Sequence, residues 1–288
     1  MSPVHSEVEL GVLAGHDGSP AAEHALDWAA RDAAARHVPL YIVTVVPISG
    51  LGHRHRVEVR ERAHALVDTA SARVRERFAG LVVEGSVREG DAAESLLAAG
   101  ARCDTMVVGS RGHGGFAGLL LGSVSLRVCA HTTCPVVVLR SEAAQDASGV
   151  VVGIGGPEDE PAAEFAAERA GLLGGGLRAV HSWALPVTGL APSLMLPSMF
   201  DVDTVTAERT RMVEQVVGPI RRRDPELPVD TVVMNGSAGR DLVCASIDGA
   251  LLVVAAHPRH GPLPMRLGPT THAVLHHAHC PVAVVPVN

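Results

Sequence analysis

The sequence contains no lysine, so all 24 of its basic residues are arginines, and 31 acidic residues outnumber them over 288 positions. This absence excludes the common phosphate loop, which needs a Gly-Lys-Ser/Thr segment. The formal net charge of −7 also argues against a basic nucleic-acid surface. The one dense arginine cluster, 221–223, is followed by Asp224 and Glu226, which is typical of a solvated helix end. We therefore predict no nucleic-acid partner.

The sequence also lacks an uninterrupted apolar run long enough for a signal peptide or a membrane span. Residues 1–10 have no basic start. The stretch 179–200 holds no Asp, Glu or Arg, but Pro186, Pro192 and Pro197 interrupt it. The five cysteines are an odd number without paired spacing, so we expect buried free thiols in a reducing compartment. These features predict a cytoplasmic protein with no membrane partner.

The second half of the sequence repeats the first. Four residues recur at one constant offset of 146 positions. They are Gly90, Gly122, Cys134 and Pro135, which recur as Gly236, Gly268, Cys280 and Pro281. The opening segments 11–15 and 149–153 also align, after a small shift. We therefore predict two tandem domains, 1–141 and 149–288, joined by a short polar, alanine-rich seam.

Within each copy, short apolar runs alternate with longer helical patterns, which is typical of an α/β fold with a parallel sheet covered on both faces. In the first copy the expected strands lie near 8–15, 40–46, 82–88, 104–109 and 135–140. The expected helices lie near 20–36, 56–79, 91–101 and 122–131. Ser19 and Pro20 are suited to the N-cap and first position of the first helix.

Ligands of such sheets bind outside the carboxyl ends of the strands, and two segments there carry residues suited to phosphate. One supplies His16 and Asp17, and the other is the glycine-rich stretch 109–115, followed by Gly122 and Ser123 at a helix start. Glycines let backbone N–H groups approach an anion, and a helix N-terminus favours negative charge. Arg111 would add charged donors. A flexible turn without a ligand explains the same glycines equally well.

The spacing of these glycines resembles that of the universal stress protein family. Nucleotide-binding members of that family carry Gly, two residues, Gly, nine residues, and then Gly followed by Ser or Thr. The matching positions here are Gly109, Gly112, Gly122 and Ser123. The segments 17–19 and 107–112, and Cys134-Pro135 ahead of the last strand, resemble the family as well. The resemblance covers both copies.

The resemblance implies two tandem five-stranded parallel sheets with strand order 3-2-1-4-5 and helices on both faces. It implies ATP or another adenine nucleotide as ligand, with or without Mg²⁺. The adenosine would lie near Asp17, Val45 and Val46. The implied ATP-binding residues are Gly15, Asp17, Val45, Val46, Gly109, Ser110, Arg111, Gly112, His113, Gly114, Gly115, Gly122, Ser123 and Val124. It also implies self-association through the last strand, either as a homodimer or as an intramolecular pseudo-dimer in which 135–140 pairs with 281–286.

The second copy departs from the family pattern at nearly every informative position. Asp17 aligns with Gly155, Gly109 with Ala255, Gly112 with Pro258 and Ser123 with Pro269. Proline has no N–H to donate, so the second loop loses backbone donors. We therefore predict one nucleotide per chain, in the first copy, and a structural or partner-binding role for the second. Leu194, Met195 and Met199 would form a contact surface or cover the vacant pocket.

These residues favour a regulatory or stress-response binding module over an enzyme. Phosphoryl transfer needs a metal held by oxygen ligands and a group that positions the attacking oxygen. Only Asp17 and Ser123 are suited to contact a metal, and no general base is evident. A slow ATPase or kinase-like enzyme and a nucleotide-free dimerisation module remain alternatives. His16 and His113 are expected at exposed loop positions near the ligand.

Overall fold

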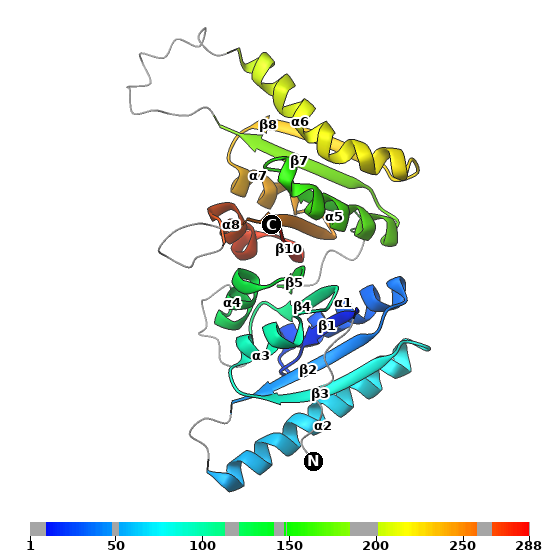
Figure 1. Cartoon of the computed structure of the whole chain (residues 1–288), viewed down its shortest axis with the longest axis vertical. Coiled ribbons are helices and arrows are strands. Elements are labelled where there is room, and N and C mark those ends of the chain that lie inside the picture. The colour runs from blue at the N-terminus through cyan, green and yellow to red at the C-terminus, as the bar shows by residue number, and fades with distance from the viewer. Residues whose placement is uncertain are drawn as a thin grey trace, which may run out of the picture. The chain divides into compact units, whose positions relative to one another are not determined.

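The first half of the chain folds into a parallel sheet of five strands (Figure 1). The computed structural model describes residues 10–47, 52–112, 121–140, 147, 149–184, 201–257 and 267–287. The five strands are β1 (Val12–Gly15), β2 (Leu40–Val46), β3 (Val83–Glu89), β4 (Thr105–Gly109) and β5 (Val136–Leu139). Their order across the sheet is β3-β2-β1-β4-β5, as predicted.

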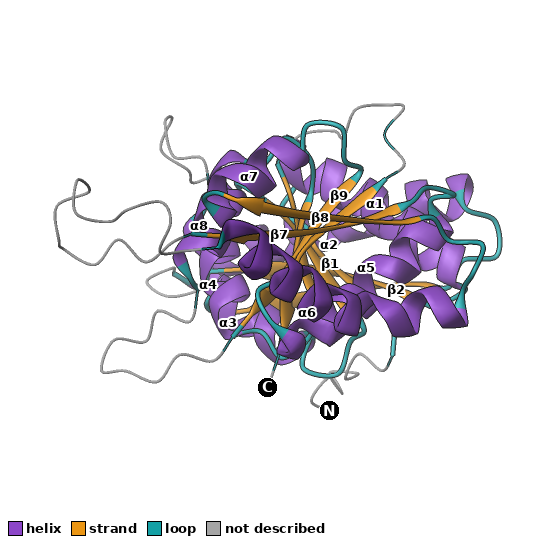
Figure 2. Ribbon diagram, turned by 90° about the horizontal axis from the view of Figure 1, so that it is seen from above, coloured by secondary structure: helices purple, strands orange, loops and turns teal. Residues whose placement is uncertain are grey.

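Four helices cover the two faces of this sheet. They are α1 (Pro20–Arg36), α2 (His53–Arg77), α3 (Ala92–Ala99) and α4 (Ser123–His131). Figure 2 shows α1 on one side of the strands and α3 with α4 on the other. Helix α1 begins as predicted, because Ser19 is its N-cap and accepts a hydrogen bond from the Ala22 amide. Its buried face is mostly alanine, so the helix axis lies close to the strands.

The second half repeats this arrangement in a separate unit. Its parallel strands are β6 (Val150–Gly153), β7 (Leu177–Trp183), β8 (Val229–Asn235) and β9 (Leu251–Ala256), with β6 between β7 and β9. Its helices are η1 (Pro157–Asp159), α5 (Glu160–Leu172), α6 (Val202–Arg223), α7 (Ala238–Ala245) and α8 (Pro269–His277). The inner strands β6 and β9 are buried aliphatic runs without alternation, as strands covered on both faces require, whereas β8 is only partly buried.

The last strand, β10 (Val282–Pro286), closes the second copy in sequence but groups with the first unit by its contacts. It pairs antiparallel with β5, with Val284 opposite Val136 and Val282 opposite Val138. This confirms the predicted pairing of 135–140 with 281–286. The edge of β5 that would otherwise be open therefore has its backbone groups satisfied within the chain.

No described helix is long and apolar enough to cross a membrane. The longest of these helices, α2, ends in a basic turn and exposes most of its length, so it covers β2 and β3 through a narrow apolar stripe.

The predicted contact surface at Leu194, Met195 and Met199 lies outside the described residues.

Candidate functional site

The carboxyl ends of β1 and β4 meet at Asp17 and Gly112. A Cβ placed on Gly112 would meet the Asp17 carboxylate and no backbone atom, so only this side chain would have to rotate. Asp17 Oδ1 accepts a hydrogen bond from the Ser19 amide at 3.0 Å, and the Ser19 hydroxyl donates to the Arg111 carbonyl at 3.2 Å. Ser19 thus caps α1 and also connects the two loops. Asp17, Arg111 and Gly112 are exposed, so this junction is open to solvent.

The N-terminus of α4 lies directly on the segment that follows β4. The Gly122 amide donates to the Ser110 carbonyl at 2.6 Å, and the Ser125 hydroxyl donates to the Gly109 carbonyl at 2.7 Å. Gly122 is the N-cap of α4 and offers no side-chain acceptor, so the first-turn amides, including those of Ser123 and Val124, lack acceptors within the helix. The two halves of the predicted glycine motif are therefore adjacent, beside the positive end of a helix dipole.

His113, Gly114 and Gly115 were predicted to complete this loop, and they lie outside the described residues. The predicted adenosine-side residues Val45 and Val46 lie at the carboxyl end of β2, the neighbour of β1. Val46 is buried, and its carbonyl accepts a hydrogen bond from the Gly90 amide at 3.0 Å. The predicted ATP-binding residues that the structure describes therefore all lie at the carboxyl ends of the strands of the first sheet.

Two of the predicted glycines are accounted for by helix packing. A Cβ on Gly109 would lie 2.7 Å from the Ala21 carbonyl carbon and 2.9 Å from the Ala22 nitrogen, both in the backbone of α1. A Cβ on Gly15 would lie 3.2 Å from Leu96 of α3 and 3.3 Å from Val108. Gly109 thus lets the first turn of α1 approach β4, and Gly15 makes room for α3. Neither contact needs a ligand.

The expectation that His16 lies at an exposed loop position is wrong. His16 is 2% exposed, and its Nε2 lies 3.0 Å from Glu23 Oε1 on α1. Burial acts to raise the pKa of the Glu23 carboxyl, but hydrogen bonds from Arg73 and His16 and their charges outweigh it, so that pKa lies below its ordinary value. The His16 carbonyl accepts from Thr44 at 2.6 Å. His16 therefore holds the loop before Asp17 in place and points into the fold.

Arg140 was missed as a candidate site residue. It directly follows β5, at the same edge of the sheet as Arg111, which follows β4. Gly109 lies opposite Leu139 in the register of β4 and β5, and the Ser110 amide donates to the Leu139 carbonyl at 2.7 Å, so the segments that follow the two strands are neighbours. Burial lowers the pKa of the Arg140 guanidinium, and repulsion from Arg111 lowers it further. The sequence analysis placed Arg140 inside the expected strand 135–140, whereas β5 ends at Leu139 and leaves Arg140 as the first residue after the strand. Two arginines beside a helix N-terminus create a positive site suited to an anion.

The second unit fills the corresponding strand ends with its own side chains. Asp159 is 2% exposed, and its Oδ2 accepts from the Gly155 amide at 2.5 Å and the Gly156 amide at 3.4 Å. Its Oδ1 lies 2.8 Å from Nε2 of His257, the residue at the position of Arg111 after the offset of 146. Burial raises the pKa of this carboxyl despite those hydrogen bonds. A protein carboxylate thus occupies strand-end amides that an external anion would otherwise approach.

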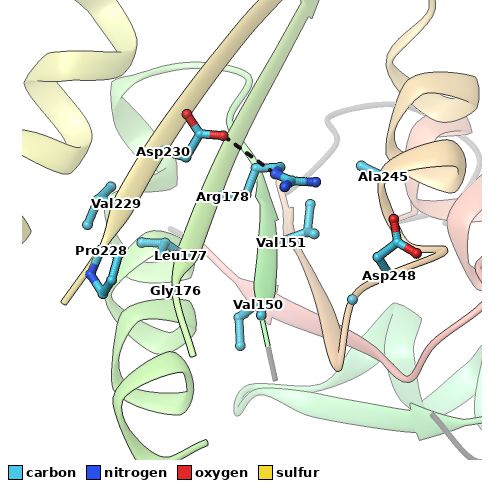
Figure 3. A pocket seen from close by; sticks show the side chains of 12 residues that line it. Val150, Val151, Gly176, Leu177, Arg178, Pro228, Val229, Asp230, Ala245 and Asp248 are labelled. Carbon is cyan, nitrogen blue, oxygen red and sulfur yellow. Dashed lines mark ion pairs between the residues drawn. The ribbon is translucent and has the colours of Figure 1, made fainter. Parts of the chain in front are cut away.

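A hollow in the second unit lies at the opposite edge of its sheet. Figure 3 shows it at the amino ends of β6, β7 and β8, where Arg178 forms an ion pair with Asp230 at 3.6 Å. Its volume is about 460 Å³, and its floor is apolar, with Val150, Val151 and Leu177. Strand-end ligands of parallel sheets bind at carboxyl ends, so this hollow is separate from the predicted nucleotide site.

Two parallel sheets with helices on both faces, repeated along the chain, define a tandem α/β protein, and comparisons with known proteins give the family. The model of the Universal stress protein family matches residues 11–140 and 149–286. A universal stress protein of Mycobacterium tuberculosis is 30% identical over 309 residues, covering 96% of this chain and 95% of the relative. Another from that organism is 32% identical over 289 residues, covering 95% and 96%. The chain belongs to the universal stress protein family, in tandem form.

A solved structure supports the fold. The crystal structure of a universal stress protein from Archaeoglobus fulgidus superposes with a TM-score of 0.73 at 19% identity, covering 96% of each chain. At this identity the likeness establishes the fold alone. The site residues therefore depend on the geometry of this chain itself.

Proposed function

We propose that the first unit binds one molecule of ATP, with or without Mg²⁺, and that the second unit binds none. The chain then acts as a nucleotide-binding regulatory module of the cytoplasmic stress response. The observation that carries this proposal is that the segments holding Arg111 and Arg140 and the α4 N-terminus are adjacent at the carboxyl ends of β4 and β5. Charged donors and free helix amides together are suited to a polyphosphate. Asp17 and the end of β2 would then lie on the adenosine side.

The differences between the two units support a single site per chain. The second unit has His257 and Pro286 where the first has Arg111 and Arg140, so both permanent cations are lost. It also places the Asp159 carboxylate on the Gly155 amide. A phosphate approaching there would meet a buried negative charge instead of two positive ones, so electrostatics oppose binding.

The test is a calorimetric titration of the whole chain with ATP. We expect one site per chain, and the double variant Arg111→Gln, Arg140→Gln should bind at least about 100-fold more weakly, because each of two lost charged hydrogen bonds contributes about 1.5–3 kcal/mol. Arg209→Gln, Arg211→Gln is the matched control, since it also removes two positive charges, from exposed positions on α6 of the second unit. Unchanged affinity in the double variant would refute the proposal, and two sites per chain would refute the asymmetry.

The binding-module proposal is separated from the ATPase alternative by the fate of the nucleotide. Protein purified without added ligand is denatured, and its supernatant is analysed for adenine nucleotide. Bound ATP that stays intact for hours with magnesium is the expected result. Steady release of ADP by the wild type, abolished in the double arginine variant, would instead establish the enzyme.

The pairing of β5 with β10 leads us to propose that self-association through the last strand takes place within the chain. Each of these strands finds its antiparallel partner in the same polypeptide. Sedimentation equilibrium should then give the mass of one chain, 29.9 kDa. A mass of two chains at micromolar concentration would show that another surface mediates a homodimer.

A further inference from the structure

Two buried cysteines of the first unit face each other. Cys103 precedes β4 and Cys134 precedes β5, and their sulfur atoms are 3.3 Å apart. The side chains come from positions 31 residues apart in the sequence and are only 6% and 5% exposed. The sequence analysis expected unpaired cysteines buried as small apolar residues. Cys103 and Cys134 are indeed buried free thiols, but their mutual contact was not expected; for Cys244, which is exposed, the expectation is wrong.

The loops that carry the two thiols are held by hydrogen bonds. The Cys134 amide donates to the Thr132 hydroxyl at 3.1 Å, and that hydroxyl donates to the Cys134 carbonyl at 2.6 Å. The Met106 amide donates to the Pro135 carbonyl at 2.8 Å, which joins the start of β4 to the start of β5. The two thiols therefore lie close together because the strands that they precede, β4 and β5, are neighbours in the sheet. A side-chain rotation could close most of the remaining gap to the bonded distance of about 2.05 Å.

The two thiols are also chemically unequal. The hydrogen bond between the two sulfurs lowers the pKa of the Cys134 thiol against the effect of burial. The same hydrogen bond, together with burial, raises the pKa of the Cys103 thiol. Cys134 is thus the group that forms thiolate, the nucleophilic form of cysteine, while Cys103 keeps its proton.

The second unit offers an internal comparison. Cys280 occupies the position of Cys134, whereas Gly249 occupies the position of Cys103. A Cβ on Gly249 would lie 3.6 Å from the Cys280 sulfur, so the two units share this geometry but only the first has both thiols. Burial raises the pKa of Cys280 to about 12, as expected for a buried thiol without a thiol donor.

We propose that Cys103 and Cys134 form a reversible oxidation site that takes a small uncharged hydroperoxide and closes to a disulfide. The Cys134 thiolate attacks one peroxide oxygen, the O–O bond breaks, and the leaving hydroxide takes a proton to become water. The sulfur of Cys103 then attacks the resulting sulfenic acid, the S–O bond breaks, and the proton of Cys103 leaves with the second water. Two thiols lose two electrons, and one hydrogen peroxide is reduced to two waters. The disulfide joins the start of β4 to that of β5.

The experiment uses the full chain with Cys244→Ser, which removes the exposed thiol and leaves four of the five cysteines. After hydrogen peroxide treatment, thiols are counted in denaturant and disulfide-linked peptides are identified by mass spectrometry. We expect four thiols to fall to two, with 103 joined to 134, and dithiothreitol to restore four. Retention of four thiols, or a bridge between other positions, would overturn the proposal.

Two variants give independent checks. Cys103→Ser should form no intramolecular disulfide under the same treatment. Gly249→Cys adds a thiol beside Cys280 at a position where a Cβ makes only ordinary contacts, of 3.5 Å or more. It should gain a second, 249–280 disulfide and so lose four thiols of five. If the 103–134 disulfide forms but the 249–280 disulfide does not, proximity of the two sulfurs is not sufficient for oxidation. That result would overturn the geometric basis of the proposal.

Discussion

Gly109 and Gly112 belong to one glycine motif, yet the structure assigns them different physical constraints, and a pair of alanine variants should separate these. In Gly109→Ala the new methyl would lie 2.7 Å from the Ala21 carbonyl carbon and 2.9 Å from two further backbone atoms of α1. Ordinary contact begins at 3.4 Å, so the first turn of α1 must retreat by 0.7 Å (3.4 − 2.7). Overpacking of this kind costs about 1–3 kcal/mol in the free energy of unfolding.

Gly112→Ala is the matched control. Its methyl would meet only the carboxylate of Asp17, the far end of an exposed side chain that can rotate away. The expected loss is below about 0.5 kcal/mol.

The two units can be followed separately, because the chain has two tryptophans, Trp28 on α1 and Trp183 on β7. In a Trp183→Phe background, the fluorescence of Trp28 monitors unfolding of the first unit in urea. Trp28 lies on α1, the helix that must move in Gly109→Ala. We expect Gly109→Ala to unfold at lower urea than the parent, and Gly112→Ala to unfold with the parent. Equal midpoints for Gly109→Ala and the parent would refute the packing argument and would leave ligand approach as the reason for glycine at 109.

Three further predictions concern stability. Since burial raises the pKa of the Asp159 carboxyl in the folded state, the folded chain binds that proton more tightly, and stability should fall as pH rises from the ordinary pKa of an aspartate through the raised one. Urea midpoints from pH 4 to 7 should show this loss in the wild type and a smaller one in Asp159→Asn; parallel curves would contradict it. The oxidised 103–134 form should be about 3–4 kcal/mol more stable than the reduced form, because the bridge closes a loop of 31 residues; equal urea midpoints with and without dithiothreitol would contradict it. Ser19→Ala should cost about 1 kcal/mol by removing the α1 cap and the bond to Arg111, whereas Ser123→Ala, at an exposed position with no capping role, should be neutral in thermal unfolding.

Much of the architecture followed from the sequence because it rests on local patterns. The constant offset of 146 revealed the duplication, and the β-branched runs around Val107 and Val136 indicated strands buried on both faces. The helix expected at 20–36 is α1, because Ser19, Pro20 and an alanine-rich face specify its start and its packing. The glycine spacing from 109 to 123 also located the edge of the sheet at which the candidate site lies.

What the sequence by itself determined is therefore the family, the repeat and the edge of the sheet that carries the candidate site, since periodicity, caps and spacing are properties of neighbouring residues. The tertiary structure alone decided which distant side chains meet. Arg140 joined the site because β5 ends at Leu139, opposite Gly109 of β4, and Cys103 met Cys134 at the other ends of those strands. His257, which follows β9, met Asp159, which precedes α5. These contacts depend on strand register and side-chain packing, which fix distances across the sheet that the linear sequence does not contain.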